Sequence, residues 1–178
     1  EIHEGPQYHI RNVDWEGNTV YRDETLTAAL GIEKGDVYNS DRLDQNLHGN
    51  RRSSDVSSLY MNRGYMLFRV QPEVRVVGDS LDLHYDVYEG DIFTFGEISI
   101  AGNSKTKEHV IRRELYTVPG QTFSRELIQE TIRRLSQLNY FDQEKLGAGP
   151  GISLDQEKKL VDLAYKLEEV GSDQLELS

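Results

Sequence analysis

Residues 13–18, VDWEGN, return further along the chain as residues 98–103, ISIAGN. The shift that carries Gly17 onto Gly102 also superimposes other apolar residues and glycines, namely Leu26 on Ile111, Leu30 on Leu115, Gly35 on Gly120 and Tyr38 on Phe123. A repeat of this length is longer than a solenoid unit and fits two copies of a small self-contained domain. The repeat therefore predicts two similar domains in tandem, an arrangement more typical of binding modules than of enzymes.

Composition limits the classes of partner. The chain has 178 residues, of which 37% are hydrophobic and 29% are charged, and its formal net charge is −11. This balance predicts a folded chain, and the excess of acidic groups disfavours binding to nucleic acid or to an anionic membrane. Cysteine is absent, which excludes disulfides and thiol chemistry. The sequence also has no apolar stretch of transmembrane length.

The spacing of apolar residues indicates the same order in each half: strand, helix, helix, strand, strand. This order predicts an α+β fold in which one sheet face packs beneath helices and the other meets solvent. The expected strands are 8–15, 67–77 and 81–88 in the first half, and 93–100, 141–146 and 161–167 in the second. The expected helices are 23–30 and one capped by Asn39 in the first half, and two capped by Thr106 and Ser124 in the second.

The second helix of the first half carries an insert. Its apolar pattern is interrupted at residues 48–54 and then resumes through Tyr60. Aligning Gly64 with Asn139 leaves ten extra residues in the first copy. We interpret the insert as a longer or broken second helix.

Pro72 lies inside the strand expected at 67–77. Because proline has no N–H to donate to a ladder, this strand is expected at a sheet edge. The free N–H and C=O groups of an edge strand can receive an extended segment of another protein as a further strand. A protected edge is an equally good interpretation, since Pro72 and the charges of Arg69, Glu73 and Arg75 can also block such pairing.

Candidates for catalysis or metal binding are few. No His-Glu-x-x-His or Gly-x-Ser-x-Gly motif occurs, and no nucleophile and base can be paired. Asp82, His84 and Asp86 share one face of an expected strand and have donor types that bind metals. The second copy has alanine and lysine at two of the three equivalent positions, which favours a merely hydrophilic outer face. Neither a metal nor a cofactor is predicted.

The second half contains the motifs IAGN at 100–103, VIRREL at 110–115, PG at 119–120, YF at 140–141 and VDLAY at 161–165. Together they resemble the last POTRA (polypeptide-transport-associated) domain before the barrel in the BamA family of outer-membrane protein assembly factors. Residues 173–178, DQLELS, are similar to the start of that family's first barrel strand. The resemblance covers nearly the whole chain and is weaker in the first half, where the insert departs from the short form of the domain.

The resemblance implies two tandem βααββ POTRA domains at 1–91 and 92–172, each a three-stranded mixed sheet with two helices on one face. The first would be the penultimate domain, with its ten-residue insert, and the second the last before the barrel, with 173–178 as a truncated barrel strand. The implied function is a non-catalytic scaffold on the periplasmic face of the outer membrane of a Gram-negative bacterium. Its implied partners are unfolded outer-membrane proteins, bound by strand addition, an accessory lipoprotein, and its own C-terminal barrel as the link to the membrane.

Two groups of residues are candidates for partner binding. The expected edge strands supply Leu67, Phe68, Arg69, Val70 and Arg75 in the first copy, and Phe141, Gln143 and Lys145 in the second. The resemblance adds Arg112, Arg113 and Glu114, and either arginine could reach an acidic lipoprotein partner. The alternative role of these three is to stabilise the first helix and the sheet above it. Pro119 stands where relatives can carry an acidic residue, so no partner contact is transferred to it.

Three other functions compete with this one. A related barrel translocator that exports a dedicated partner would have similar POTRA domains, although the motifs of the second half favour assembly. A cell-division protein with a POTRA-like fold normally has one copy beside a transmembrane helix, so two copies disfavour it. An enzyme is conceivable if Asp82, His84 and Asp86 bind a metal.

Overall fold

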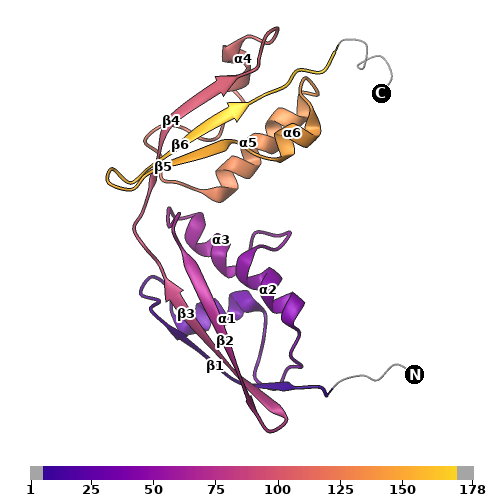
Figure 1. The fold of residues 1–178 in the computed structure, drawn as a ribbon, viewed down its shortest axis with the longest axis vertical. Helices are drawn as coiled ribbons and strands as arrows, with labels where there is room; N and C mark the ends of the chain where they lie inside the picture. Colours follow the sequence, from indigo (N-terminus) through magenta and orange to yellow (C-terminus); the bar gives the residue numbers. More distant parts are fainter. Residues whose placement is uncertain (1–5, 172–178) are drawn as a thin grey trace, which may run out of the picture. The chain divides into compact units, whose positions relative to one another are not determined.

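The computed structural model describes residues 6–171, which divide into two compact units (Figure 1). The first unit comprises the described residues up to 61 together with 65–91, and the second comprises 62–64 and the described residues from 92 on. Each unit is a three-stranded mixed sheet with helices, which confirms the predicted α+β class. The strand expected at 173–178 lies outside the described residues. Within 6–171, no helix is both long and apolar enough to cross a membrane.

The first unit has its central strand last in sequence. Its elements are β1 (His9–Glu16), α1 (Asp23–Leu30), α2 (Ser40–His48), α3 (Val56–Met61), β2 (Arg69–Val77) and β3 (Ser80–Tyr88). The sheet order is β1-β3-β2, with β1 parallel and β2 antiparallel to β3. In β3 the predicted alternation is confirmed, because Leu81, Leu83, Tyr85 and Val87 are buried on the helix side.

The helices of this unit begin and end where local chemistry predicts. Asn39 caps α2 by accepting a hydrogen bond from the backbone N–H of Arg42 at 3.0 Å. The insert is a broken helix, as one interpretation held, since α2 ends at His48 and α3 starts at Val56. Buried Asp55 accepts hydrogen bonds from the N–H and hydroxyl of Ser58, and so holds the start of α3.

The second unit repeats the topology with a shorter first helix and a shorter hairpin. They are β4 (Thr94–Ala101), α4 (Glu108–Arg112), α5 (Arg125–Gln137), α6 (Gln143–Gly147), β5 (Gly151–Asp155) and β6 (Leu160–Lys166). The sheet order is β4-β6-β5, again with one parallel and one antiparallel pair. Ser124 caps α5 as predicted. Thr106 does not cap α4, because the helix starts one residue later, after Lys107.

The strand expected at 141–146 is wrong. Residues 143–147 form α6, which Asp142 caps by accepting the N–H of Lys145 at 2.9 Å. Phe141 and Leu146 are both buried, whereas a strand would place residues five apart on opposite faces of the sheet. The antiparallel neighbour of β6 is instead β5, which begins directly after Pro150.

The repeated Gly-Asn pairs have one physical cause. Gly17 and Gly102 follow the first strand of each unit with φ of 86° and 88°, a region that L side chains rarely adopt. A Cβ at either position would collide with a backbone carbonyl oxygen, that of Val87 or of Leu167. Glycine is therefore required where the turn crosses the end of the central strand.

Candidate partner-binding surfaces

β2 is an edge strand, as Pro72 predicted. It pairs with β3 from Arg69 opposite Tyr88 to Val77 opposite Ser80 without a register shift, and its other side is not paired with a strand in the described residues. In an antiparallel ladder every second residue bonds to the neighbouring strand. Pro72 cannot donate, so in this ladder its nitrogen faces away from β3. Val74 and Val76, which share its phase, then present their N–H and C=O groups to the open side.

A groove runs beside this open edge, between α2 and β2. It has a volume of about 210 Å³, and its walls include Leu43 and Leu47 of α2 and Pro72 and Val74 of β2. Val74 is 43% exposed and Val76 is 61% exposed, although both lie opposite buried residues of β3. The helices thus leave the helix-facing side of the edge strand partly uncovered.

The five candidate residues around β2 differ in what they can offer. Phe68 and Val70 belong to the core, where Phe68 stacks on Tyr60 with ring centroids 4.2 Å apart. Their side chains are therefore not available to a partner. Arg69 is exposed and lies over the ring of Tyr88. The remaining two are half-buried Leu67, which precedes β2, and exposed Arg75, which pairs with Glu73 at 2.9 Å.

The second-copy candidates do not form an edge. Phe141 is 1% exposed and lies in the core. Gln143 and Lys145 are exposed on α6, where the ammonium group of Lys145 pairs with Glu168. Sequence reasoning missed the true edge, β5, whose half-exposed Ile152 and Leu154 are counterparts of the β2 valines. The repeat itself carried a signal for β5. In the first copy the hairpin partner directly precedes the central strand, so a strand is expected at the same place in the second copy.

Arg112, Arg113 and Glu114 have separate environments. Arg112 pairs with Glu108 at 2.6 Å and donates to the carbonyl oxygen of Ile98, so it supports its own helix and strand. Glu114 lies 3.9 Å from Arg134. Arg113 is exposed and forms no ion pair within residues 6–171. Of the three, Arg113 is the exposed charge that no carboxylate engages in the described residues.

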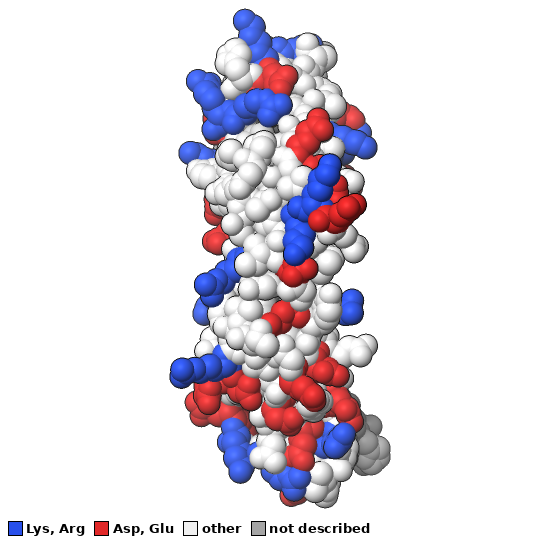
Figure 2. Space-filling model, turned by 90° about the vertical axis from the view of Figure 1, so that its left-hand side faces the viewer, with Lys and Arg blue, Asp and Glu red and all other residues white. Residues whose placement is uncertain are grey.

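The outer face of the first sheet is acidic, and Figure 2 shows acidic side chains gathered over this unit. Asp82, His84 and Asp86, which the sequence favoured as a merely hydrophilic face, have different neighbours in the structure. The guanidinium of Arg11 donates to Asp82 at 2.8 Å and lowers the pKa of that carboxyl. Glu16 of β1 takes the place of Asp82 beside the histidine. The hydrogen bond with Asp14 raises the pKa of His84.

The POTRA family, described as a surface antigen variable number repeat, matches this sequence twice, at residues 8–90 and 93–170. The chain belongs to the POTRA family. The two POTRA matches correspond to the two halves of the sequence repeat and to the two sheets of the structure.

The curated relatives of these POTRA domains carry the name expected from the motifs. The outer membrane protein assembly factor BamA of Neisseria meningitidis is 29% identical over 179 residues, which is 99% of this chain and 22% of that protein. BamA of Nitratidesulfovibrio vulgaris is 24% identical over 174 residues, covering 94% of this chain and 21% of that protein. The resemblance to BamA is confirmed, and the chain spans about a fifth of the length of these relatives.

Solved POTRA structures share the fold. The crystal structure of POTRA3-5 of Haemophilus influenzae BamA has a TM-score of 0.71 and 18% identity, covering 91% of this chain and 61% of that one. BamA of Haemophilus ducreyi lacking POTRA domains 1-3 also has a TM-score of 0.71, with 16% identity, and covers 93% of this chain and 30% of that one. At these identities the likeness establishes the fold alone.

Proposed function

We propose that this chain forms the two barrel-proximal POTRA domains, 1–91 and 92–172, of an outer-membrane protein assembly factor. The proposal rests on the family match in both halves, on the names of the curated relatives and on the motifs of the second half. The chain would act as a non-catalytic scaffold on the periplasmic face of the outer membrane of a Gram-negative bacterium. Its link to the membrane would be a barrel that follows residue 172.

The proposed client is an unfolded outer-membrane protein that adds as a strand to β2. The observation that carries this is the open edge, where Val74 and Val76 present unpaired backbone groups beside the groove under α2. Backbone hydrogen bonds supply affinity that depends little on the client sequence, and alternate client side chains can enter the groove. Pro72 leaves one donor missing, so we expect weak pairing that releases the client again.

We expect NMR titration with synthetic segments of unfolded outer-membrane proteins to shift amide signals along β2. The variant Val74→Lys should weaken this binding, because a lysine stem and charge would occupy the groove. Val118→Lys is the matched control, since Val118 is similarly exposed, at 53%, but lies in a loop of the second unit. Equal loss of binding in both variants, or shifts confined to residues outside β2 and α2, would contradict strand addition at this edge.

The second proposed partner is an accessory lipoprotein of the assembly machine, docked through Arg113. This arginine is an exposed cation, whereas Arg112 is engaged by Glu108 and the carbonyl oxygen of Ile98. We expect Arg113→Glu to weaken binding to a purified accessory lipoprotein by at least tenfold in a surface-immobilised assay. Arg52→Glu, an identical change at an exposed position of the first unit, should leave the affinity unchanged. Unaltered binding by Arg113→Glu would remove this arginine from the interface.

A further inference from the structure

We propose that the outer face of the first sheet binds one divalent transition-metal ion through Glu16, His84 and Asp86, with Asp14 as the residue that positions the histidine. These residues come from two strands, β1 and β3, that are distant in sequence. No role in the proposed scaffold function depends on them.

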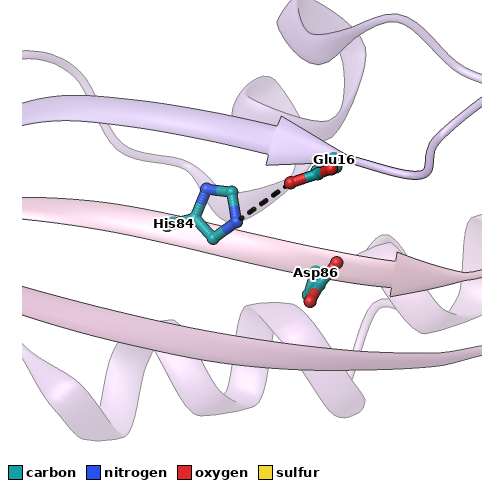
Figure 3. A group of neighbouring side chains, drawn as sticks. All are labelled: Glu16, His84 and Asp86. Carbon is teal, nitrogen blue, oxygen red and sulfur yellow. Dashed lines mark ion pairs between the residues drawn. The ribbon is translucent and has the colours of Figure 1, made fainter.

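The strand register brings the three ligands together. His84 and Asp86 are two residues apart on β3, so their side chains share one face. Glu16 is the parallel partner of Asp86 and lies on the same face (Figure 3). One donor atom from each residue lies within 4.8 Å of the others, and Nε2 of His84 is 3.7 Å from a carboxylate oxygen of Glu16. An ion held at about 2.0–2.2 Å from each donor needs only small side-chain rotations.

Asp14 supplies the second observation that points to a metal. Its carboxylate is hydrogen-bonded to Nδ1 of His84, which leaves Nε2 directed at Glu16. Histidine ligands commonly donate their other ring nitrogen to a carboxylate, an arrangement that fixes the tautomer and raises the basicity of the ligating nitrogen. Asp14 therefore holds the imidazole of His84 in the way that a carboxylate commonly holds a metal-ligating histidine.

The competing cations on this face are already engaged. Arg11 is held by Asp82 and Arg75 by Glu73, and Arg69, which lines the same hollow as Asp86, lies over the ring of Tyr88. In the described part of the chain, the carboxylate of Asp86 accepts no hydrogen bond and has no ion-pair partner, while the carboxylate of Glu16 pairs only with His84. Two carboxylates next to one imidazole thus retain negative charge that an added cation would neutralise.

The donor set selects a class of ion. Carboxylates alone would suit Mg²⁺ or Ca²⁺, but an imidazole nitrogen favours Zn²⁺ and its neighbours in the first transition row. The side chain of Glu16 is 76% exposed, so water would complete the coordination. In the second unit the positions equivalent to His84 and Asp86 are Ala164 and Lys166, which predicts one ion per chain.

The test is calorimetric titration of the whole chain with Zn²⁺ in moderate salt, followed by NMR of the imidazole signals. We expect one site, with shifts at His84 and along the ends of β1 and β3. His84→Gln should abolish the site, and Glu16→Gln and Asp86→Asn should each weaken it by tenfold or more. Asp14→Asn should weaken Zn²⁺ binding by about 10–100-fold, the usual cost of removing such a carboxylate.

Glu73→Gln is the matched control. Glu73 lies opposite His84 on the other neighbouring strand, so the variant removes the same charge from the same face without removing a ligand. Its Zn²⁺ affinity should stay much closer to that of the unaltered chain than the affinity of Glu16→Gln does, even though the change releases Arg75 from its ion pair. The proposal is overturned if Glu73→Gln weakens binding as much as Glu16→Gln, if Mg²⁺ displaces Zn²⁺ at equal concentration, or if His84→Gln retains the site.

Discussion

Two glutamates, Glu89 and Glu169, close the same loop in the two units. Each follows the central strand and accepts hydrogen bonds from the turn that follows the first strand of its unit. Glu89 binds the N–H and hydroxyl of Thr19, and Glu169 binds the hydroxyl of Ser104 and the N–H of Thr106. Such charge-assisted bonds are stronger than neutral ones. The repeated Gly-Asn turn is thus held by a carboxylate that lies outside the repeated motif itself.

The clearest pH effect is expected at Glu169. Hydrogen bonds from Ser104 and then from Thr106 and Lys105 lower the pKa of this carboxyl from 4.5 to about 2. A depressed pKa in the folded state contributes stability above the unfolded pKa and loses it as the pH falls through the folded one. Between pH 4.5 and 2, the second unit should therefore lose stability in the unaltered chain.

The variant Glu169→Gln should reduce this dependence, because the amide cannot titrate. Urea unfolding followed by circular dichroism across that pH range measures the effect. Glu157→Gln, an exposed position in the turn before β6, should keep the slope of the unaltered chain. An unchanged slope in Glu169→Gln would show that other carboxyls dominate acid unfolding.

At the scale of elements, the first helix of the second unit is short, and side-chain hydrogen bonds from α5 and β6 hold the segment that follows it. α4 has 5 residues, whereas α1 has 8. The segment after α4 is tied to α5, because buried Thr131 accepts the backbone N–H of Tyr116 at 2.9 Å. It is also tied to β6 through Thr117, whose hydroxyl lies 3.0 Å from that of Tyr165.

Thr131→Val should destabilise the second unit by about 1 kcal/mol, the cost of losing the part-buried hydrogen bond from the N–H of Tyr116. The change conserves volume, so loss of the hydrogen bond is the main effect. Thr131→Ser keeps the hydroxyl and should retain the bond to Tyr116, which hydrogen exchange of that amide can verify. A stability of Thr131→Val equal to that of the unaltered chain would mean that water replaces the acceptor.

The elements that sequence reasoning located have local signals. The helix expected at 23–30 is observed at those residues, and Asn39 and Ser124 cap helices as predicted. The error at 141–146 has a local cause too, since the side chain of Asp142 caps a short helix there.

At the scale of the whole molecule, each unit has a core of its own. Leu83 and Tyr85 of β3 belong to the first core, and Leu163 of β6 is equally buried in the second unit. Trp15 is the one tryptophan of the chain, and it stacks on Tyr85 with centroids 4.4 Å apart. Tryptophan fluorescence therefore reports on the first unit, whereas circular dichroism reports on both.

Leu83→Ala and Leu163→Ala should each destabilise one unit by about 2–5 kcal/mol, as buried leucines do. Leu83→Ala is expected to lower the urea midpoint seen by fluorescence. Leu163→Ala should leave that midpoint unchanged and lower a transition seen by circular dichroism. A fluorescence midpoint that moves equally in both variants would show that the two units unfold together.

The tandem of two α+β domains, the order of the elements in the first of them and the edge position of β2 could be inferred from the chain alone, because periodicity, caps and Pro72 act over a few residues. Contacts between distant segments could not. The parallel register of β1 on β3 brings Glu16 and Asp14 to His84, while Arg11 removes Asp82 from that group. The identity of β5 as the second edge likewise depends on its pairing with β6. The register of β1 on β3 follows from packing of the whole domain, since the two strands are far apart in the sequence and no tight turn sets their pairing.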